Sequence, residues 1–204
     1  ISDNSLHVEV LIELSVARFN NLIRFFLNQH HCLMPSTEQL KQVRLQLLAS
    51  DDKNPEIKVA EHFFRRFKGT LFLTPAYEDI SDWKTSIDVY ESDSEITLPD
   101  NLGKLIFSHK NMEEKQLTYI CLPKKEQQVS VCFSHDNPKC LPDFRQRSRN
   151  LKKVLQELDI APWQRKRIAF LYYDDELVAA IGHFICQSFI VNGTEPGIHI
   201  SQVI

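Results

Sequence analysis

The first part of the chain carries apolar residues at the spacing of an amphipathic helix. Ser15 stands where an N-cap is expected, and Arg18, Asn21 and Arg24 fall on the polar side of the pattern. The apolar stripe consists of Val16, Phe19, Leu22, Ile23 and Phe26. The pattern therefore predicts a helix that packs one face against a core.

A second helix is predicted to follow Pro35. Ser36 and Gln39 have the spacing of a capping box, in which each side chain binds the backbone N–H of the other residue. The expected buried face consists of Leu40, Val43, Leu47 and Leu48. Together the two segments predict an αα-hairpin.

From residue 63 the pattern changes to that of strands. Residues 63–74 are strand-like and end at Pro75, so we expect residues 1–75 to form a helical domain with a terminal strand. Residues 76–94 are rich in Asp and Glu, and we expect 76–127 to be an acidic connector with short strands. Short strands are predicted over 96–98, 104–107, 117–122 and 129–133.

The last part of the chain, residues 128–204, combines one helix with strands. Leu151, Val154, Leu155 and Leu158 recur at helical spacing, with Ser148 or Asn150 as N-cap, and the opposite side presents Arg149, Lys152, Lys153 and Gln156. Three strands are predicted over 168–173, 177–181 and 183–190, with Asp174-Asp175 as the first turn. The predicted fold class is α+β: a small helical domain followed by a mostly antiparallel β domain with one cationic helix.

Charge is unevenly distributed along the chain. The whole chain has a net charge of −3, yet the segment from Phe144 to Ile168 contains eight basic and two acidic residues, and the remainder therefore carries −9. The basic residues of this segment are Arg145, Arg147, Arg149, Lys152, Lys153, Arg165, Lys166 and Arg167. Such a concentration favours binding of a polyanion, with an ordinary solvated helix face as the alternative.

Two aromatic features lie beside this basic segment. Tyr172 and Tyr173 are adjacent on a predicted strand and must point to opposite faces, so one is expected in the core and the other exposed. An exposed tyrosine near the cationic helix could stack on a nucleotide, but ordinary strand packing is the favoured interpretation. Trp163 follows Pro162 and is expected to hold the turn against the sheet.

No residue pattern predicts a catalytic centre or a metal site. The five cysteines are widely spread, which argues against a disulfide framework, and the one zinc-like spacing consists of Cys132, His135 and Cys140 with Cys121. Buried thiols in apolar strands explain these cysteines better. No apolar run approaches the roughly 20 residues of a membrane helix, and we expect a cytoplasmic protein that does not contact a membrane.

The segment from Arg147 to Gly182 resembles the C-terminal domain of bacterial tRNA(Ile)-lysidine synthetases. The family pattern is a Leu-Lys-Lys helix that ends in Gln-Glu, then Pro-Pro-Trp, an Arg-x-Arg stretch and a Leu-Leu-Tyr-Tyr hairpin that closes on glycine. In this sequence it reads Leu151-Lys152-Lys153, Ala161-Pro162-Trp163, Arg165-Lys166-Arg167, Phe170-Leu171-Tyr172-Tyr173 and Gly182. The sequence departs from the pattern at Ala161 and Ala169, where proline is usual or frequent, at His183, where an apolar residue is common, and in lacking a glycine just before the helix. A second segment, Ala17 to Leu27 followed by Met34-Pro35-Ser36 and the Phe63 to Leu73 strand, resembles the middle domain of the same family.

The resemblance implies a catalytic domain N-terminal to both segments, with a Ser-Gly-Gly-x-Asp-Ser loop that binds ATP. The five glycines of this chain include no adjacent pair and provide no such phosphate loop. We therefore expect the chain to be the C-terminal piece of a longer enzyme and to be inactive alone. ATP, Mg²⁺ and lysine are expected to bind in the missing domain, with no cofactor in this chain.

The resemblance further implies that the full enzyme ligates lysine to the wobble cytidine of tRNA(Ile) with a CAU anticodon, and that this chain recognises the tRNA. Homodimerisation stays open. The expected tRNA contacts are Arg145, Arg147, Arg149, Lys152, Lys153, Arg165, Lys166, Arg167, Arg24, Arg65 and Arg66. The alternative is a protein-interaction module whose basic face pairs with an acidic partner.

Overall fold

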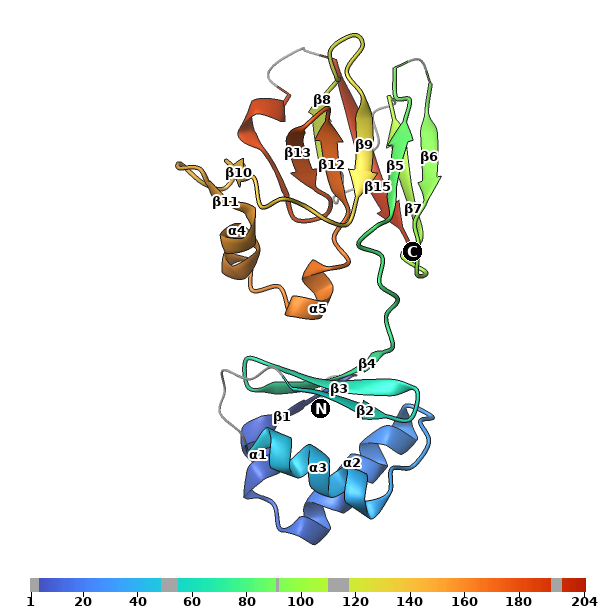
Figure 1. Cartoon of the computed structure of the whole chain (residues 1–204), viewed down its shortest axis with the longest axis vertical. Helices are drawn as coiled ribbons and strands as arrows, with labels where there is room; N and C mark the ends of the chain where they lie inside the picture. The colour runs from blue at the N-terminus through green and yellow to red at the C-terminus, as the bar shows by residue number, and fades with distance from the viewer. Residues whose placement is uncertain (1–3, 49–54, 91, 110–117, 192–195) are drawn as a thin grey trace. The chain divides into compact units, whose positions relative to one another are not determined.

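A computed structural model describes residues 4–48, 55–90, 92–109, 118–191 and 196–204 (Figure 1). The chain forms two compact units, Ile1–Tyr77 and Glu78–Ile204. Both units combine helices with antiparallel sheets, which confirms the predicted α+β class. No helix within the described ranges is long and apolar enough to cross a membrane.

The helices of the first unit follow the predicted apolar pattern. Ser15 caps the second helix through the backbone N–H of Arg18, and Ser36 and Gln39 form the predicted capping box. The helices are α1 (Val8–Glu13), α2 (Val16–Gln29) and α3 (Thr37–Leu47). Val16 and Leu48, which the pattern placed on buried faces, are exposed because each lies at a helix end.

These helices pack on one face of a four-stranded antiparallel sheet with the order β1-β4-β3-β2 (Figure 1). The strands are β1 (Ser5–His7), β2 (Glu56–Val59), β3 (His62–Phe67) and β4 (Thr70–Pro75). The single predicted strand over 63–74 is therefore a hairpin. It turns at Lys68 and Gly69, which both adopt positive φ, as two-residue hairpin turns require.

The second unit is built on two antiparallel sheets that share one hydrophobic core. Strands of one sheet contribute Val131 and Leu171, and strands of the other contribute Leu105, Phe107 and Ile200. The first sheet has the order β14-β13-β12-β9-β5 and the second β6-β7-β15-β8. Their strands are β5 (Lys84–Ile87), β6 (Ser94–Thr97), β7 (Lys104–Ser108), β8 (Thr118–Cys121), β9 (Val129–Cys132), β12 (Phe170–Tyr173), β13 (Glu176–Ala180), β14 (Phe184–Ile185) and β15 (Gly197–Val203).

A second core lies on the other face of the first sheet, where helix α4 (Leu151–Glu157) packs against Phe170 and Cys132. The short elements around it are β10 (Lys139–Cys140), β11 (Arg149–Asn150), α5 (Pro162–Arg165) and the 3-10 helix η1 (Gln187–Phe189). Pro162 opens α5, as predicted. The first sheet is thus covered by the second sheet on one side and by α4 on the other.

The structure places the predicted connector, residues 76–127, differently from the sequence prediction. The second unit begins at Glu78, and β5 pairs with β9 at the edge of the first sheet. Residues 104–108 and 118–121 pair with β15 in the second sheet. The acidic composition suggested a connector, because short strands of mixed polarity give little local signal. These strands are stabilised by pairing with strands that lie far along the chain.

Candidate nucleic-acid interface

Helix α4 is held at its first turn by the loop that follows β9. The Asn137 side-chain oxygen accepts a hydrogen bond from the backbone N–H of Lys152 at 2.9 Å, and the Pro138 carbonyl accepts one from Leu151 at 2.9 Å. Asn150 occupies the N-cap position but makes no side-chain cap bond. The side-chain hydrogen bond that caps the first turn of α4 therefore comes from Asn137, 15 positions before Lys152.

The two sides of α4 are divided as the periodicity predicted. Leu151, Val154 and Leu155 are buried in the core beneath the helix. The exposed side carries Arg149, Lys152, Lys153 and Gln156. The helix thus presents two adjacent lysines to solvent from a fixed backbone.

Several of the predicted tRNA contacts are engaged within the protein. Glu157 binds the guanidinium groups of both Arg145 and Arg149, and Arg167 binds the carboxylate and the carbonyl of Asp100. Arg165 donates from Nε to the Ile160 carbonyl at 2.7 Å, and burial lowers its pKa. Arg145, Arg149 and Arg165 thus bind groups at the end of α4 and just after it, and Arg167 binds the turn between β6 and β7.

Four exposed basic residues between Phe144 and Ile168 form no ion pair with any residue that the structure describes. We call them the exposed cation set: Arg147, Lys152, Lys153 and Lys166. Arg147 lies in the loop before β11 and Lys166 directly after α5. Among the described residues no carboxylate lies at contact distance from these four charges, so they are available to an anionic partner.

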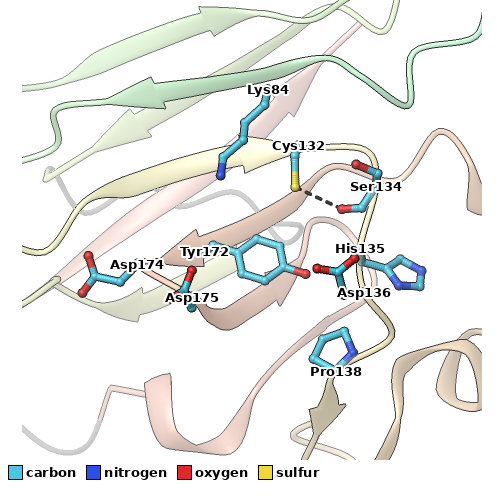
Figure 2. A pocket seen from close by; sticks show the side chains of 9 residues that line it. All are labelled: Lys84, Cys132, Ser134, His135, Asp136, Pro138, Tyr172, Asp174 and Asp175. Atoms are coloured by element: carbon cyan, nitrogen blue, oxygen red, sulfur yellow. Dashed lines mark hydrogen bonds between the residues drawn. The ribbon is translucent and has the colours of Figure 1, made fainter.

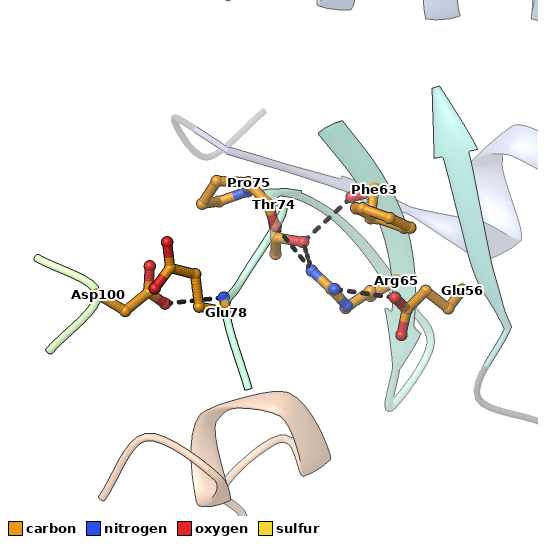
Figure 3. A network of polar contacts seen from close by, with 7 residues as sticks. All are labelled: Glu56, Phe63, Arg65, Thr74, Pro75, Glu78 and Asp100. Atoms are coloured by element: carbon orange, nitrogen blue, oxygen red, sulfur yellow. Dashed lines mark hydrogen bonds and ion pairs between the residues drawn. The ribbon is translucent and has the colours of Figure 1, made fainter. Parts of the chain in front are cut away.

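The first unit places two of its predicted contacts in the interior, which corrects their assignment as tRNA ligands. Arg65 donates to Glu56, to Thr74 and to the Pro75 carbonyl (Figure 3). Arg66 donates to the Leu47 carbonyl at 2.9 Å. Both side chains are less than 10% exposed, at 6% and 8%. Buried guanidinium groups with protein acceptors cannot reach a phosphate, and they stabilise the sheet instead.

Arg24 stands apart from that pair. It lies on α2 and is half-buried, on the polar side that the periodicity predicted. It stays a predicted contact of the first unit.

A cavity of about 410 Å³ lies in the second unit beside the start of α4 (Figure 2). Tyr172 is central to it, and Lys84 reaches in from β5. The remaining lining residues are Cys132, Ser134, His135, Asp136, Pro138, Asp174 and Asp175. Pro138 belongs to the loop that caps α4, so the cavity and the helix share one wall.

The ionisable groups of this cavity have distinct charge states. Burial, and then the nearby charge of Lys152, lowers the pKa of His135, so its imidazole is neutral at pH 7. Burial raises the pKa of Tyr172 well above its ordinary value, so the phenol keeps its proton. The effect of Lys152 on the pKa of His135 indicates that this lysine of the exposed cation set lies near the cavity.

The cysteines with zinc-like spacing serve other contacts. Cys132 donates to the Ser134 carbonyl at 3.2 Å, and a hydrogen bond from Cys186 lowers the pKa of Cys140. Across the described part of the chain, no three His, Cys, Asp or Glu side chains are grouped to hold a metal ion. Cys132 and Cys140 belong to the core beneath α4; the apolar strand pattern predicted burial for Cys132 and for Cys121, and Cys121 is only half-buried.

Comparisons with known proteins match both units. Residues 6–72 match the TilS substrate binding domain, and residues 129–202 match the TilS substrate C-terminal domain. The chain belongs to the TilS family. Its C-terminal TilS domain contains α4, the exposed cation set and all of the cavity lining except Lys84, and its substrate binding domain lies within the first unit.

Curated relatives of this TilS chain carry the name tRNA(Ile)-lysidine synthase. The proteins from Serratia proteamaculans and Vibrio parahaemolyticus are 35% and 33% identical over 91% and 92% of the chain. The protein from Coxiella burnetii is 32% identical over 96% of the chain. The chain spans about two fifths of the length of these relatives, at 41% to 42%.

Sequence reasoning missed two features of the TilS C-terminal domain. The capping role of Asn137 and the gathering of Lys84, His135 and Tyr172 depend on strand pairing between distant segments. The positive φ of Asn137, 56°, is the kind of turn conformation that asparagine tolerates, but its helix partner could not be read from spacing.

Proposed function

We propose that this chain binds tRNA through the exposed cation set of its TilS C-terminal domain. The observation that carries the proposal is the adjacent pair Lys152 and Lys153, exposed on a capped helix and without an ion pair among the described residues. Cations of this kind neutralise phosphates, which orient a nucleic acid without reading its sequence. The names of the relatives favour tRNA(Ile) as the nucleic acid.

We further propose that the chain acts as the substrate-positioning part of a lysidine synthetase. In that reaction ATP activates the wobble cytidine of the CAU anticodon, and the lysine amine attacks it. The chain has no glycine-rich phosphate loop and its described residues no three-ligand metal cluster, so its residues do not fit ATP and Mg²⁺ and we assign them no chemical step. Their contribution is to hold the tRNA, since correct positioning alone lowers the barrier of a reaction between two bound partners.

The direct test is the double charge reversal Lys152→Glu with Lys153→Glu. Because both side chains face solvent, the variant is expected to keep its melting temperature while its affinity for tRNA falls by about tenfold or more at low salt. The matched control is Lys124→Glu with Lys125→Glu, an adjacent and exposed lysine pair in the turn before β9. Equal losses in both variants, or no loss in either, would remove α4 from the interface.

A further inference from the structure

The cavity beside α4 opens where the cover of the first sheet ends. Phe170 and Cys132 pair across β12 and β9 and are covered by the core beneath α4. One step along the same face, Tyr172 pairs with Ser130, which pairs with Ser86 on β5. Small hydroxyl side chains therefore replace apolar ones beside Tyr172, and its ring is half-buried rather than covered.

The cavity has the size of a small-ligand site. Its volume of about 410 Å³ falls within the roughly 300–1,000 Å³ typical of such sites. Figure 2 shows the Tyr172 ring between Asp136 and Asp175, with Lys84 extending from β5. An aromatic ring on a sheet face, flanked by polar groups, is the arrangement on which RNA-binding sheets stack unpaired bases.

The charged residues that line the cavity favour the base of a nucleotide over its phosphate. The cavity lining contains three carboxylates, those of Asp136, Asp174 and Asp175, and one lysine, Lys84; the Asp174 carboxylate also accepts a hydrogen bond from the backbone N–H of Gln128 at 2.9 Å. This excess of negative charge disfavours a phosphate inside the cavity, whereas Lys152 at its rim favours a phosphate outside. A carboxylate is also a suitable acceptor for the exocyclic amino group of a base.

We propose that this cavity takes one unpaired nucleobase of a bound RNA, stacked on Tyr172, and that it prefers bases with an exocyclic amino group over uracil. The inference rests on the proposed function, because it assumes that the exposed cation set holds the RNA backbone. It adds a base-selective subsite to a phosphate-binding surface. Asp136 and Asp175 supply the selectivity, and Tyr172 supplies the stacking surface.

The test uses oligo(C) and oligo(U) of equal length, which differ at the amino group of each base, with binding measured by fluorescence anisotropy. The intact chain is expected to bind oligo(C) about fivefold more tightly than oligo(U). Tyr172→Leu is expected to weaken oligo(C) binding about tenfold, whereas Tyr172→Phe retains the ring and the affinity. The matched control is Tyr119→Leu, at a half-exposed tyrosine of the other sheet that stacks on His199.

A second variant keeps the test decisive if Tyr172→Leu fails to fold. Asp136→Asn with Asp175→Asn alters two exposed carboxylates, so it is expected to preserve the fold and to abolish the preference for oligo(C). An unchanged preference in this variant would overturn the inference.

The same titrations separate this inference from the proposed function. If tRNA binding is strong and falls on reversal of Lys152 and Lys153, but Tyr172→Leu and the aspartate variant change nothing, only the base subsite is overturned. If the intact chain binds neither tRNA nor the oligonucleotides, the proposed function fails and the subsite fails with it.

Discussion

Glu157 controls how many cations the interface offers. Its carboxylate binds both Arg145 and Arg149, so Glu157→Gln should release two guanidinium groups and remove one negative charge beside α4. We expect tRNA affinity at low salt to rise about two- to fivefold, because attraction to phosphates is strengthened. Stability should change by no more than about 1 kcal/mol, since these ion pairs are partly exposed.

The binding of tRNA to Glu157→Gln would be measured beside Glu126→Gln, which removes an equal charge from an exposed turn. A gain in both variants would indicate a general effect of net charge. A loss of affinity in Glu157→Gln alone would show that the paired arginines must be held in place for binding.

Arg65 is expected to matter for stability and not for tRNA contact. Arg65→Ala removes the donors to Glu56, Thr74 and Pro75 from a site that is almost fully buried, and should destabilise the first unit by about 2–4 kcal/mol. Urea unfolding followed by circular dichroism measures this. The control Lys58→Ala, at an exposed position of the adjacent strand, should cost less than about 0.5 kcal/mol.

Tryptophan fluorescence sharpens the Arg65 experiment, because both tryptophans, Trp83 and Trp163, belong to the second unit. The fluorescence transition of Arg65→Ala should therefore stay where it is in the unchanged chain. Loss of tRNA affinity in a folded Arg65→Ala protein would restore Arg65 as a direct contact.

At the residue scale, the sequence showed where cations concentrate but not which of them are free. Glu157 lies 12 residues from Arg145, and Asp100 lies 67 residues from Arg167, so charge counting along the chain could not identify these pairs. Arg65 and Arg66 were misassigned for the same reason, since their acceptors are brought to them by sheet pairing and by the end of α3.

Among the elements, α4 depends on a cap that its own sequence does not contain. Asn137→Ala removes the acceptor for the Lys152 N–H and places alanine at a positive φ, so we expect a loss of about 1–2 kcal/mol. Asn137→Asp keeps an acceptor and should be nearly neutral, and Asn150→Ala should cost little because Asn150 makes no cap bond. Chemical unfolding followed by tryptophan fluorescence provides the measurement; a larger loss in Asn150→Ala than in Asn137→Ala would refute the assignment.

The turn between β6 and β7 requires glycine for a steric reason. A Cβ at Gly103 would lie 1.9 Å from the Val203 carbonyl oxygen, and the residue has a φ of +79°. Gly103→Ala should therefore destabilise the second unit by more than about 2 kcal/mol, seen as an earlier tryptophan fluorescence transition. Gly182→Ala is the matched control, because Gly182 has a φ of +76° and no atom lies within 4 Å of the added Cβ. Its loss of stability measures the effect of the positive φ alone, without a steric clash.

Elements with a strong local signal could be predicted from the sequence, and those defined by distant pairing could not. The apolar stripes and caps of α2 and α3 and the β12–β13 hairpin are local, and the structure confirms them. Strands β5 and β15 were missed because each is short or mixed in polarity and is stabilised by partners such as β9 and β7. The base-sized cavity escaped prediction because three separate segments contribute its walls.

Considered as a whole molecule, the chain carries two TilS domains with separate hydrophobic cores. The first contributes a helix-covered sheet with internally paired arginines, and the second contributes a capped cationic helix beside a cavity. This division predicts that binding to an RNA backbone resides mainly in the second unit. The resemblance in the sequence identified the family, whereas the assignment of free and paired cations needed the structure.

Binding of tRNA by the exposed cation set would be tested by titrating the 204-residue chain with tRNA(Ile) bearing a CAU anticodon at several salt concentrations. An unrelated tRNA serves as control. We predict tight binding with a preference for tRNA(Ile). The logarithm of the binding constant should fall with the logarithm of the salt concentration, by a slope of roughly 0.7 to 0.9 per neutralised phosphate, and this slope should be shallower for Lys152→Glu with Lys153→Glu. Absence of binding at low salt, or a salt slope unchanged by the double reversal, would contradict the account.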